Sequence, residues 1–437
     1  MSLPDGAQSR FPSPPPFLGR IKTAYWILFA ILLIASFTRF WRLTTPDQCY
    51  FDEVYFPTTA AEILRGDNNA WAFYGHENTH PPLSKEIMAL GMGIFGHRSG
   101  AAVDGGCWGD QEDEAKRTDP DWLYKPIGWR FFGALASVGS VLFMYLLSKR
   151  LFQSEVAALA SAAFLTFDGL ALAQSRIATP DAYVLFFLLG TLYFLVSDRF
   201  LLSGVFYGAA AACKWIGAFA MAPIVLYLIV RLLRGIQETE PDDRMKPVER
   251  VLQAAAVFFG IAAVAGVLGA FLGGGFADGG KAAAVPGAVA VVIVVFSLAR
   301  IVASRELRST ARGRLYVEMA LVLPVFFLIV PGYIYLLTYV PMLLNGHATG
   351  FLGLGDVWEL NKQAYEFHSS LTATHGYSST WSEWPILSRP IYLYVDSTGG
   401  AKIYSMGNPV VFWLGIPAIA FVLLQGLNLR TRLHSLS

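Results

Sequence analysis

The sequence has little charge for its length. Of its 437 residues, 15% are Asp, Glu, Lys or Arg, 54% are hydrophobic, and the formal net charge is +1. A mean hydropathy of +0.47 together with so few charges excludes an ordinary soluble domain. A net charge near zero gives no electrostatic footprint for nucleic acid. We therefore expect an all-α polytopic membrane protein with no nucleic-acid partner.

Cysteine is also scarce, with three residues in the whole chain, which excludes a disulfide framework. Cys49 and Cys107 fall in one expected exterior loop, so they can form a single bridge or remain two thiols. Cys213 lies in an apolar segment and is expected to pack there. His368 and His375 occur without an HExxH pattern, which argues against a metal site. We expect no cofactor.

The chain lacks an apolar core in its first 20 residues, which are rich in Pro and Ser and typical of neither a signal peptide nor a folded domain. Its glycine-rich stretches also lack the Lys and Ser/Thr spacing of a phosphate-binding loop. We expect cytoplasmic tails at 1–21, disordered, and at 429–437. The transmembrane domain then covers 22–428.

Long apolar runs fill most of that domain. Because a helix needs about 20 apolar residues to cross a bilayer, we expect about ten spans, at roughly 22–43, 128–148, 154–174, 179–197, 201–213, 217–233, 251–272, 284–303, 315–339 and 409–428. Lys and Arg gather beside alternate ends of these spans, and the positive-inside rule makes that side the cytoplasm. The N-terminus is then cytoplasmic. Two long exterior loops, 44–127 and 340–408, are expected to carry the function.

The first exterior loop carries two adjacent carboxylates, Asp52 and Glu53, in the stretch CYFDEVYF. The residues after them have helical periodicity, so the pair is expected to open a short amphipathic helix at the membrane surface. Adjacent helical side chains point about 100° apart and cannot face each other across a scissile bond. If the pair is catalytic, one carboxylate acts and the other supports it. The alternative is an acidic pair that only complements the helix dipole.

A second motif, HENTHPPLSKEIMAL, places a lysine where a helix is expected to begin. Pro81 and Pro82 preset the helix start, and Lys85 falls in its first turn. A cation there opposes the helix dipole, which is reasonable if Lys85 and the free helix N–H groups share an anion such as a lipid phosphate. A lysine extending from an interfacial helix toward lipid headgroups is the alternative.

Four more charged residues fall at the exterior ends of expected spans: Arg130, Arg176, Asp181 and Lys214. A charge at membrane depth costs about 2.5–3.5 kcal/mol on insertion scales, so each is a functional candidate, with headgroup anchoring as the alternative. Cations and carboxylates on one face would match a lipid-phosphate donor and a general base. We expect the three cations among them to gather with Lys85 near one anion.

The second exterior loop is dense in Trp, Tyr, His and Ser between residues 366 and 394. Aromatic belts at membrane interfaces explain part of this enrichment, but not so many polar and aromatic residues in one stretch. We expect the loop to fold over the site and to offer aromatic surfaces to a sugar. Trp384 is its substrate-binding candidate.

Six motifs, taken in order along the chain, resemble those of the protein O-mannosyltransferase family, membrane enzymes of the GT-C fold that use polyprenyl-phosphate-mannose. They are FDE at 51–53, HPPLSK at 80–85, SRIATPD at 175–181, CKWIGAF at 213–219, YSSTWSEWPILSRP at 377–390 and GNPVVFW at 407–413. Each motif alone is weak. The ordered set covers most of the chain from 40 to 413.

The resemblance implies a GT-C-type bundle and an inverting glycosyltransferase that moves mannose from polyprenyl-phosphate-mannose to Ser/Thr hydroxyls of exported proteins. Asp52 matches the catalytic base, with Glu53 beside it. A phosphate-linked sugar already carries a good leaving group, so one base is enough and cations assist departure. The positions that match cationic or polar roles around donor and loop are His80, Lys85, Arg130, Arg176, Lys214 and Arg389.

The implied setting is a multi-pass protein of the cell membrane with its active site on the exterior face. Its expected partners are the lipid-linked sugar, a secreted protein acceptor and membrane lipid, with the export machinery as a further candidate. The sequence departs from the family in an apparent extra hairpin at about 251–303, and the family's last C-terminal helices are not evident. Two other functions stay open: a GT-C transferase that glycosylates a lipid or cell-wall polymer, and an inactive membrane scaffold or transporter.

Overall fold

The structure is a computed structural model, and most of what it describes is helical. The described residues are 17–47, 49–73, 77–95, 126–240, 246–247, 250, 303–305, 309–344, 353–372, 378–380, 382–396 and 398–434. The expected span at 251–272, all but the last residue of the span at 284–303, and Cys107 lie outside them. Those three expectations therefore stay predictions.

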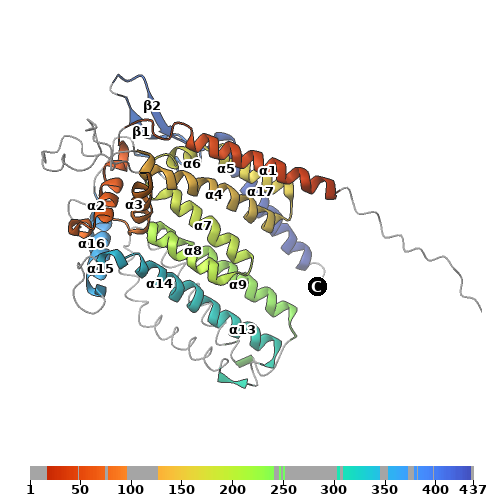
Figure 1. Cartoon of the computed structure of the whole chain (residues 1–437). Coiled ribbons are helices and arrows are strands. Elements are labelled where there is room, and N and C mark those ends of the chain that lie inside the picture. Colours follow the sequence, from red (N-terminus) through yellow and green to blue (C-terminus); the bar gives the residue numbers. More distant parts are fainter. Residues whose placement is uncertain are drawn as a thin grey trace, which may run out of the picture. The chain divides into compact units, whose positions relative to one another are not determined.

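The helices follow the expected apolar runs where the chain is described (Figure 1). The helices over the first runs are α1 (Phe17–Phe40), α4 (Pro126–Phe152), α5 (Glu155–Thr166), α6 (Gly169–Gln174), α7 (Asp181–Val196) and α8 (Phe200–Cys213). The run expected as one span at 154–174 is two helices, because Asp168 caps a new helix by accepting the Ala171 N–H at 2.8 Å.

The later helices are α9 (Met221–Glu238), α13 (Ala311–Leu321), a π-helix η6 (Val322–Ile329), α14 (Val330–Leu337), α15 (Val340–Leu344), α16 (Leu354–Ser370) and α17 (Pro409–His434). Within the described part of the chain, four helical stretches are long and apolar enough to cross a membrane: Thr23–Phe40, Pro126–Phe152, Trp215–Glu238 and Ala311–Leu337. Shorter apolar helices accompany them. The protein is thus a helical, multi-pass membrane protein.

The chain forms two compact units. One comprises Met1–Phe219 and Pro331–Ser437, and the other Ala220–Val330. In the second unit, α9 pairs with α13, and Arg231 donates to Glu318 at 3.0 Å. The candidate site residues all belong to the first unit.

Short elements gather at one end of the helices of the first unit (Figure 1). They are the 3₁₀ turns η1 (Phe51–Val54) and η2 (Asn68–Trp71), α2 (Phe56–Arg65), α3 (Leu83–Phe95) and α16. A buried cluster that includes Phe56, Met88, Trp129 and Tyr183 joins α2 and α3 to α4 and α7. At Gly91 a Cβ would meet the carbonyl oxygen of Gly128 at 2.2 Å, so α3 lies directly against α4.

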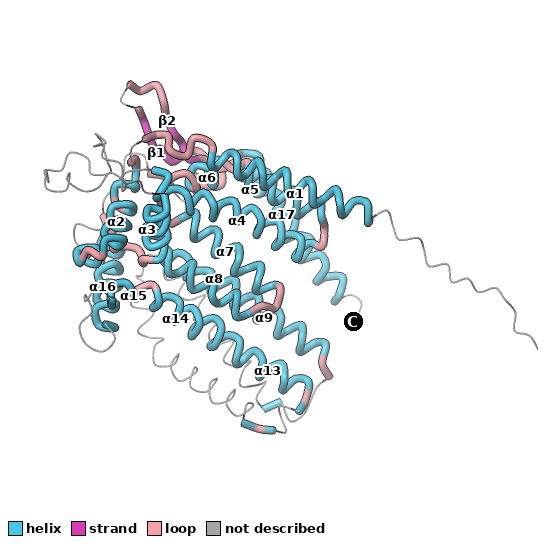
Figure 2. Tube along the Cα trace, in the orientation of Figure 1, coloured by secondary structure: helices cyan, strands magenta, loops and turns pink. Residues whose placement is uncertain are grey.

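The expectation of an all-α chain is not quite met. Strands β1 (Ile391–Val395) and β2 (Lys402–Ser405) form an antiparallel hairpin (Figure 2). The alternating IYLYV sequence favours a strand, and its buried Leu393 packs with Tyr50. The Tyr50 and Tyr394 rings lie 5.6 Å apart, so this hairpin of the second exterior loop rests beside the acidic pair.

Candidate active site

The acidic pair lies in η1, between α1 and α2. Phe51, its first residue, has a φ of 54°, in the left-handed region that non-glycine residues seldom adopt. The neighbouring carboxylates have different surroundings, since Glu53 is fully buried whereas Asp52 is half-buried. They are therefore suited to different roles.

Glu53 and Arg130 form a buried, bidentate ion pair. Arg130 donates from Nε and Nη2 to the two carboxylate oxygens of Glu53, each at 2.7 Å, and neither side chain is exposed. Glu53 also accepts the Ala178 N–H at 2.9 Å, and Arg130 donates to the carbonyls of Leu43 and Pro46. Two desolvated charges in this geometry depend on each other. Arg130 is thus bound to protein oxygens, and Glu53 positions η1.

Arg176 holds the end of α1. It donates to the carbonyls of Thr38 at 2.8 Å, Arg39 at 3.0 Å and Arg42 at 3.1 Å. The carbonyls at the end of a helix have no partner within the helix. The guanidinium of Arg176 supplies these partners, which is a structural use and not the expected one.

Lys85 does fall in the first turn of its helix, and the anion that compensates it is a protein carboxylate. It is fully buried and donates to the carbonyl oxygen of Glu77, to Glu77 Oε2 and Asn78 Oδ1 at 3.2 Å, and to the His80 carbonyl at 3.1 Å. Burial alone would raise the pKa of Glu77, but Lys85 and hydrogen bonds from His80 and Thr79 lower it to about 2. Lys85 therefore stabilises the conformation of residues 77–80, the loop before α3.

Asp52 has a different electrostatic environment. Burial raises its pKa above the ordinary value for an aspartate, as does the charge of Asp181, while Lys214 and His80 lower it. Lys214 is one-third exposed and donates to Asp181 at 3.0 Å. Asp52 is thus a carboxylate whose pKa responds to Lys214 and His80, and no hydrogen bond or ion pair of its side chain is found among the described residues. Such a carboxylate can accept a proton.

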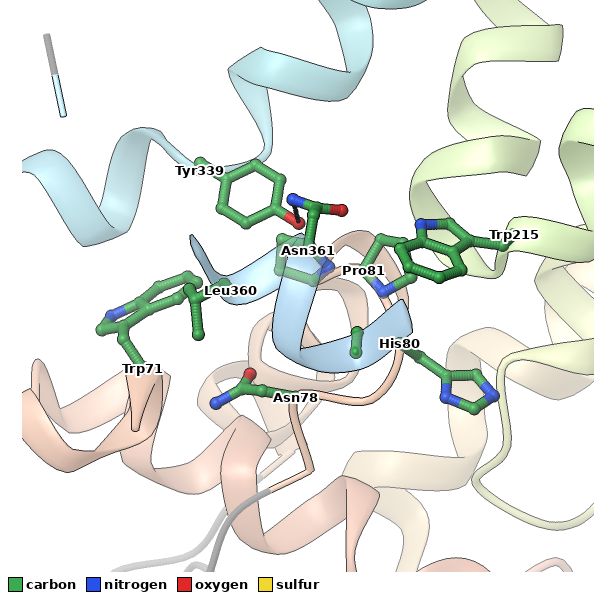
Figure 3. Close-up of a pocket in the computed structure, with 10 residues that line it drawn as sticks. Trp71, Asn78, His80, Pro81, Trp215, Tyr339, Leu360 and Asn361 are labelled. Carbon is green, nitrogen blue, oxygen red and sulfur yellow. Dashed lines mark hydrogen bonds between the residues drawn. The ribbon is translucent and has the colours of Figure 1, made fainter. Parts of the chain in front are cut away.

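Lys214 and His80, but not Asp52, line a cavity of about 390 Å³. This volume is within the range of small-molecule sites, about 300–1,000 Å³. The residues that line it are Thr79, His80, Lys214, Trp215, Ile216, Tyr365, His368 and Ser369. A smaller hollow shares His80 and Trp215 with it, and Figure 3 shows Trp215 beside Pro81 there. The lining of the larger cavity thus combines polar side chains with the indole of Trp215.

The four cations expected around one anion bind different protein oxygens. Lys85 binds Glu77, Arg130 binds Glu53, and Arg176 binds the carbonyls at the end of α1. Lys214 pairs with Asp181 and lines the cavity. His80 lines it too, with Nδ1 at 3.3 Å from Glu77 Oε1.

Trp384 and Arg389, the candidates from the second exterior loop, make local contacts. The Trp384 indole N–H donates to Ser379 at 3.0 Å, and its ring is 60% exposed. Arg389 donates to the Ser378 carbonyl at 2.8 Å and lies 3.7 Å from Glu383. Neither residue lines the cavity.

The same loop does reach the site through α16, which sequence reasoning missed. Tyr365, His368 and Ser369 follow the spacing of one helix face and line the cavity. His368 Nε2 lies 3.0 Å from the Thr79 carbonyl oxygen, and its ring is 5.4 Å from that of His80. The spacing was visible in the sequence, whereas the docking of α16 against the loop before α3 was not.

The cysteines and metal ligands can be followed only in part. Cys49 is disulfide-bonded and Cys213 is a free, buried thiol. The pairing of Cys49 with Cys107 stays a prediction, because Cys107 lies outside the described residues. Among the residues that are described, no three His, Cys, Asp or Glu side chains are grouped so as to hold a metal ion.

Two family models match the chain. Residues 29–272 match the model of dolichyl-phosphate-mannose-protein mannosyltransferases. Residues 354–435 match the model of the C-terminal four-transmembrane region of protein-O-mannosyltransferase.

Curated relatives carry similar names. A polyprenol-phosphate-mannose–protein mannosyltransferase of Mycolicibacterium smegmatis is 23% identical over 94% of this chain and 74% of its own length. The protein of the same name from Mycobacterium tuberculosis is 24% identical over 91% of this chain and 70% of its own length. Among solved structures, the S. cerevisiae Pmt1–Pmt2 complex bound to the sugar donor is 19% identical, with a TM-score of 0.47 over 75% of this chain and 35% of that chain.

Proposed function

The chain belongs to the dolichyl-phosphate-mannose-protein mannosyltransferase family, and from this premise we propose that its cavity receives a polyprenyl-phosphate-linked mannose. The enzyme transfers the mannose, with inversion, to Ser/Thr hydroxyls of exported proteins. The observation that carries this proposal is a cavity of about 390 Å³ lined by Lys214 and His80, the two groups whose charges act on the half-buried carboxylate of Asp52.

The chemistry needs a base and a place for a phosphate. Lys214 and His80 supply the charge and the hydrogen bonds that a departing phosphate requires. Asp52 takes the proton of the acceptor hydroxyl. The hydroxyl oxygen attacks the anomeric carbon of the mannose from the face opposite the phosphate, and the phosphate leaves. No cofactor is needed, because the donor already carries its leaving group.

The proposed topology has about ten spans, a cytoplasmic N-terminus and an exterior active site built from two long loops. It is supported by the distribution of Lys and Arg along the sequence. An exterior site in the cell membrane would meet acceptor proteins as they leave the export machinery. Membrane lipid would surround the prenyl chain of the donor.

Transfer by the purified protein tests this function. The protein in detergent is incubated with polyprenyl-phosphate-[³H]mannose and a Ser/Thr-rich peptide, beside a matched peptide in which every Ser and Thr is Ala. We expect label on the first peptide only. Label recovered in a lipid or polysaccharide fraction would favour the alternative acceptors, and no transfer to any acceptor would contradict the proposal.

Replacing Lys214 with alanine is expected to weaken donor binding. A charge-assisted hydrogen bond is worth about 1.5–3 kcal/mol, so the KM for the donor should rise about 10- to 150-fold. The matched control is Lys362→Ala, because Lys362 lies on α16 and is 48% exposed, away from the cavity lining. An unchanged donor KM in Lys214→Ala would remove Lys214 from the phosphate site.

The pH dependence of kcat gives a second test. The base works when deprotonated, and the pKa of Asp52 is raised by burial, so activity should be lost on acidification at a higher pH than for an ordinary aspartate. Lys214 lowers this pKa and Asp181 raises it. With kcat measured at saturating donor, Lys214→Met should move the acid limb of the pH profile to higher pH. Asp181→Asn should move it to lower pH. Equal shifts in one direction would contradict the assignment.

A further inference from the structure

Trp215 lines the cavity directly after Lys214 in the sequence. It follows Lys214, whose backbone is extended with φ −162° and ψ 137°, and it begins the short helix η5 (Trp215–Ala220). It lines both the large cavity and the smaller hollow. The ring of His368 lies 6.1 Å from it. Two consecutive residues therefore present an ammonium group and an indole to the same cavity.

The indole of Trp215 is held by a chain of hydrogen bonds. Its N–H donates to the Tyr335 hydroxyl at 3.1 Å, and that hydroxyl donates to Asn361 Oδ1 at 2.5 Å. The Asn361 amide donates in turn to the Tyr339 hydroxyl at 3.1 Å and to the Val357 carbonyl at 2.8 Å. Figure 3 shows the Asn361 amide directed at Tyr339.

This series of hydrogen bonds joins three separate elements, since Trp215 is in η5, Tyr335 in α14 and Asn361 in α16. Each hydroxyl or amide in the chain polarises the next, which favours one arrangement of the set. Buried indole N–H groups usually find such a partner. The Trp215 indole is thus held in place by Tyr335 and Asn361, which do not line the larger cavity.

We propose that the Trp215 face is the hexose subsite of this cavity, and that Tyr335 is a positioning residue that acts on the hexose through Trp215. The proposal rests on the proposed function, because it assumes a phosphate-linked sugar donor. A hexose carries an apolar face of C–H groups that suits an aromatic surface, while its phosphate needs a cation. Lys214 and Trp215 offer these two surfaces from consecutive residues, matching the two consecutive parts of one glycosyl phosphate.

The test compares two donors that differ in the sugar alone, polyprenyl-phosphate-mannose and polyprenyl-phosphate-glucose. A tilted indole changes how the hexose lies, so Tyr335→Phe should lower kcat/KM for the mannosyl donor about 3- to 10-fold, as expected for one lost hydrogen bond. In the proposed mannosyltransferase the subsite fits mannose better than glucose, so the glucosyl donor should lose less and the ratio of the two kcat/KM values should narrow. Tyr333→Phe, on the same helix with 62% of the residue exposed, is the matched control and should change neither value.

A double-mutant cycle separates positioning from a general structural effect. Trp215→Phe keeps an aromatic face but lacks the N–H, so adding Tyr335→Phe to it should cost nothing further. Trp215→Leu, which removes the face, should lose the preference between donors even where thermal stability is kept. Additive losses, or equal losses on both donors, would overturn the proposal. If the wild-type protein transfers no mannose, the proposed function itself fails.

Discussion

Replacing Asp52 with asparagine is expected to lower the rate of mannose transfer by about 10²- to 10⁴-fold, the usual loss when a general base is removed. The amide has nearly the same size as the carboxylate but cannot accept the proton of the acceptor hydroxyl. Because Lys214 and His80 stay in place, the affinity for the donor should change little. The measurement is single-turnover transfer at saturating donor, together with donor binding.

The matched control for Asp52→Asn is Asp47→Asn. Asp47 is an exposed carboxylate of the same loop and does not line the cavity. The Asp47→Asn variant should transfer mannose at the wild-type rate. Wild-type turnover in Asp52→Asn would show that another group takes the proton.

Replacing Glu53 with alanine is expected to give the largest loss of stability. Removing one partner of a buried ion pair costs about 3–5 kcal/mol, because the other charge stays buried and uncompensated. Arg130 would be that charge, since neither side chain is exposed and two bonds of 2.7 Å join them. The expected result is a large drop in the thermal midpoint in detergent, with activity lost because η1 no longer holds Asp52.

The matched control is the ion pair of Arg231 and Glu318, which are joined at 3.0 Å and are 30% and 44% exposed. Glu318→Ala should cost no more than about 1 kcal/mol. The double variant Glu53→Leu with Arg130→Met should regain part of the stability, since no charge is left unpaired. It should stay inactive. Equal small losses for both ion pairs would mean that the Glu53–Arg130 pair does not hold the loop.

The sequence predicted well what depends on local patterns. Where the chain is described, the apolar runs are helical, and Pro81 and Pro82 do precede a helix with Lys85 in its first turn. The same local argument failed for the partner of Lys85. The dipole rule called for an anion, but it could not tell a bound phosphate from Glu77, a carboxylate of the chain itself.

Contacts between distant segments explain the remaining differences. Glu53 and Arg130 are 77 positions apart, and no spacing rule links residues at that distance. The cost of a charge at membrane depth makes Arg130 and Arg176 candidates for substrate binding, and the structure shows that protein oxygens also offset that cost. Tyr335 and Asn361 are 26 positions apart and only their tertiary contact with Trp215 gives them a role.

The most direct test of the proposed mechanism is a structure of the inactive Asp52→Asn variant with polyprenyl-phosphate-mannose bound. We expect the phosphate within hydrogen-bond distance, about 3 Å, of Lys214 and His80. We also expect the hexose against Trp215, with its anomeric carbon open toward residue 52 on the face opposite the phosphate. A phosphate bound instead by Lys85, Arg130 or Arg176, or an anomeric carbon turned away from residue 52, would contradict the mechanism.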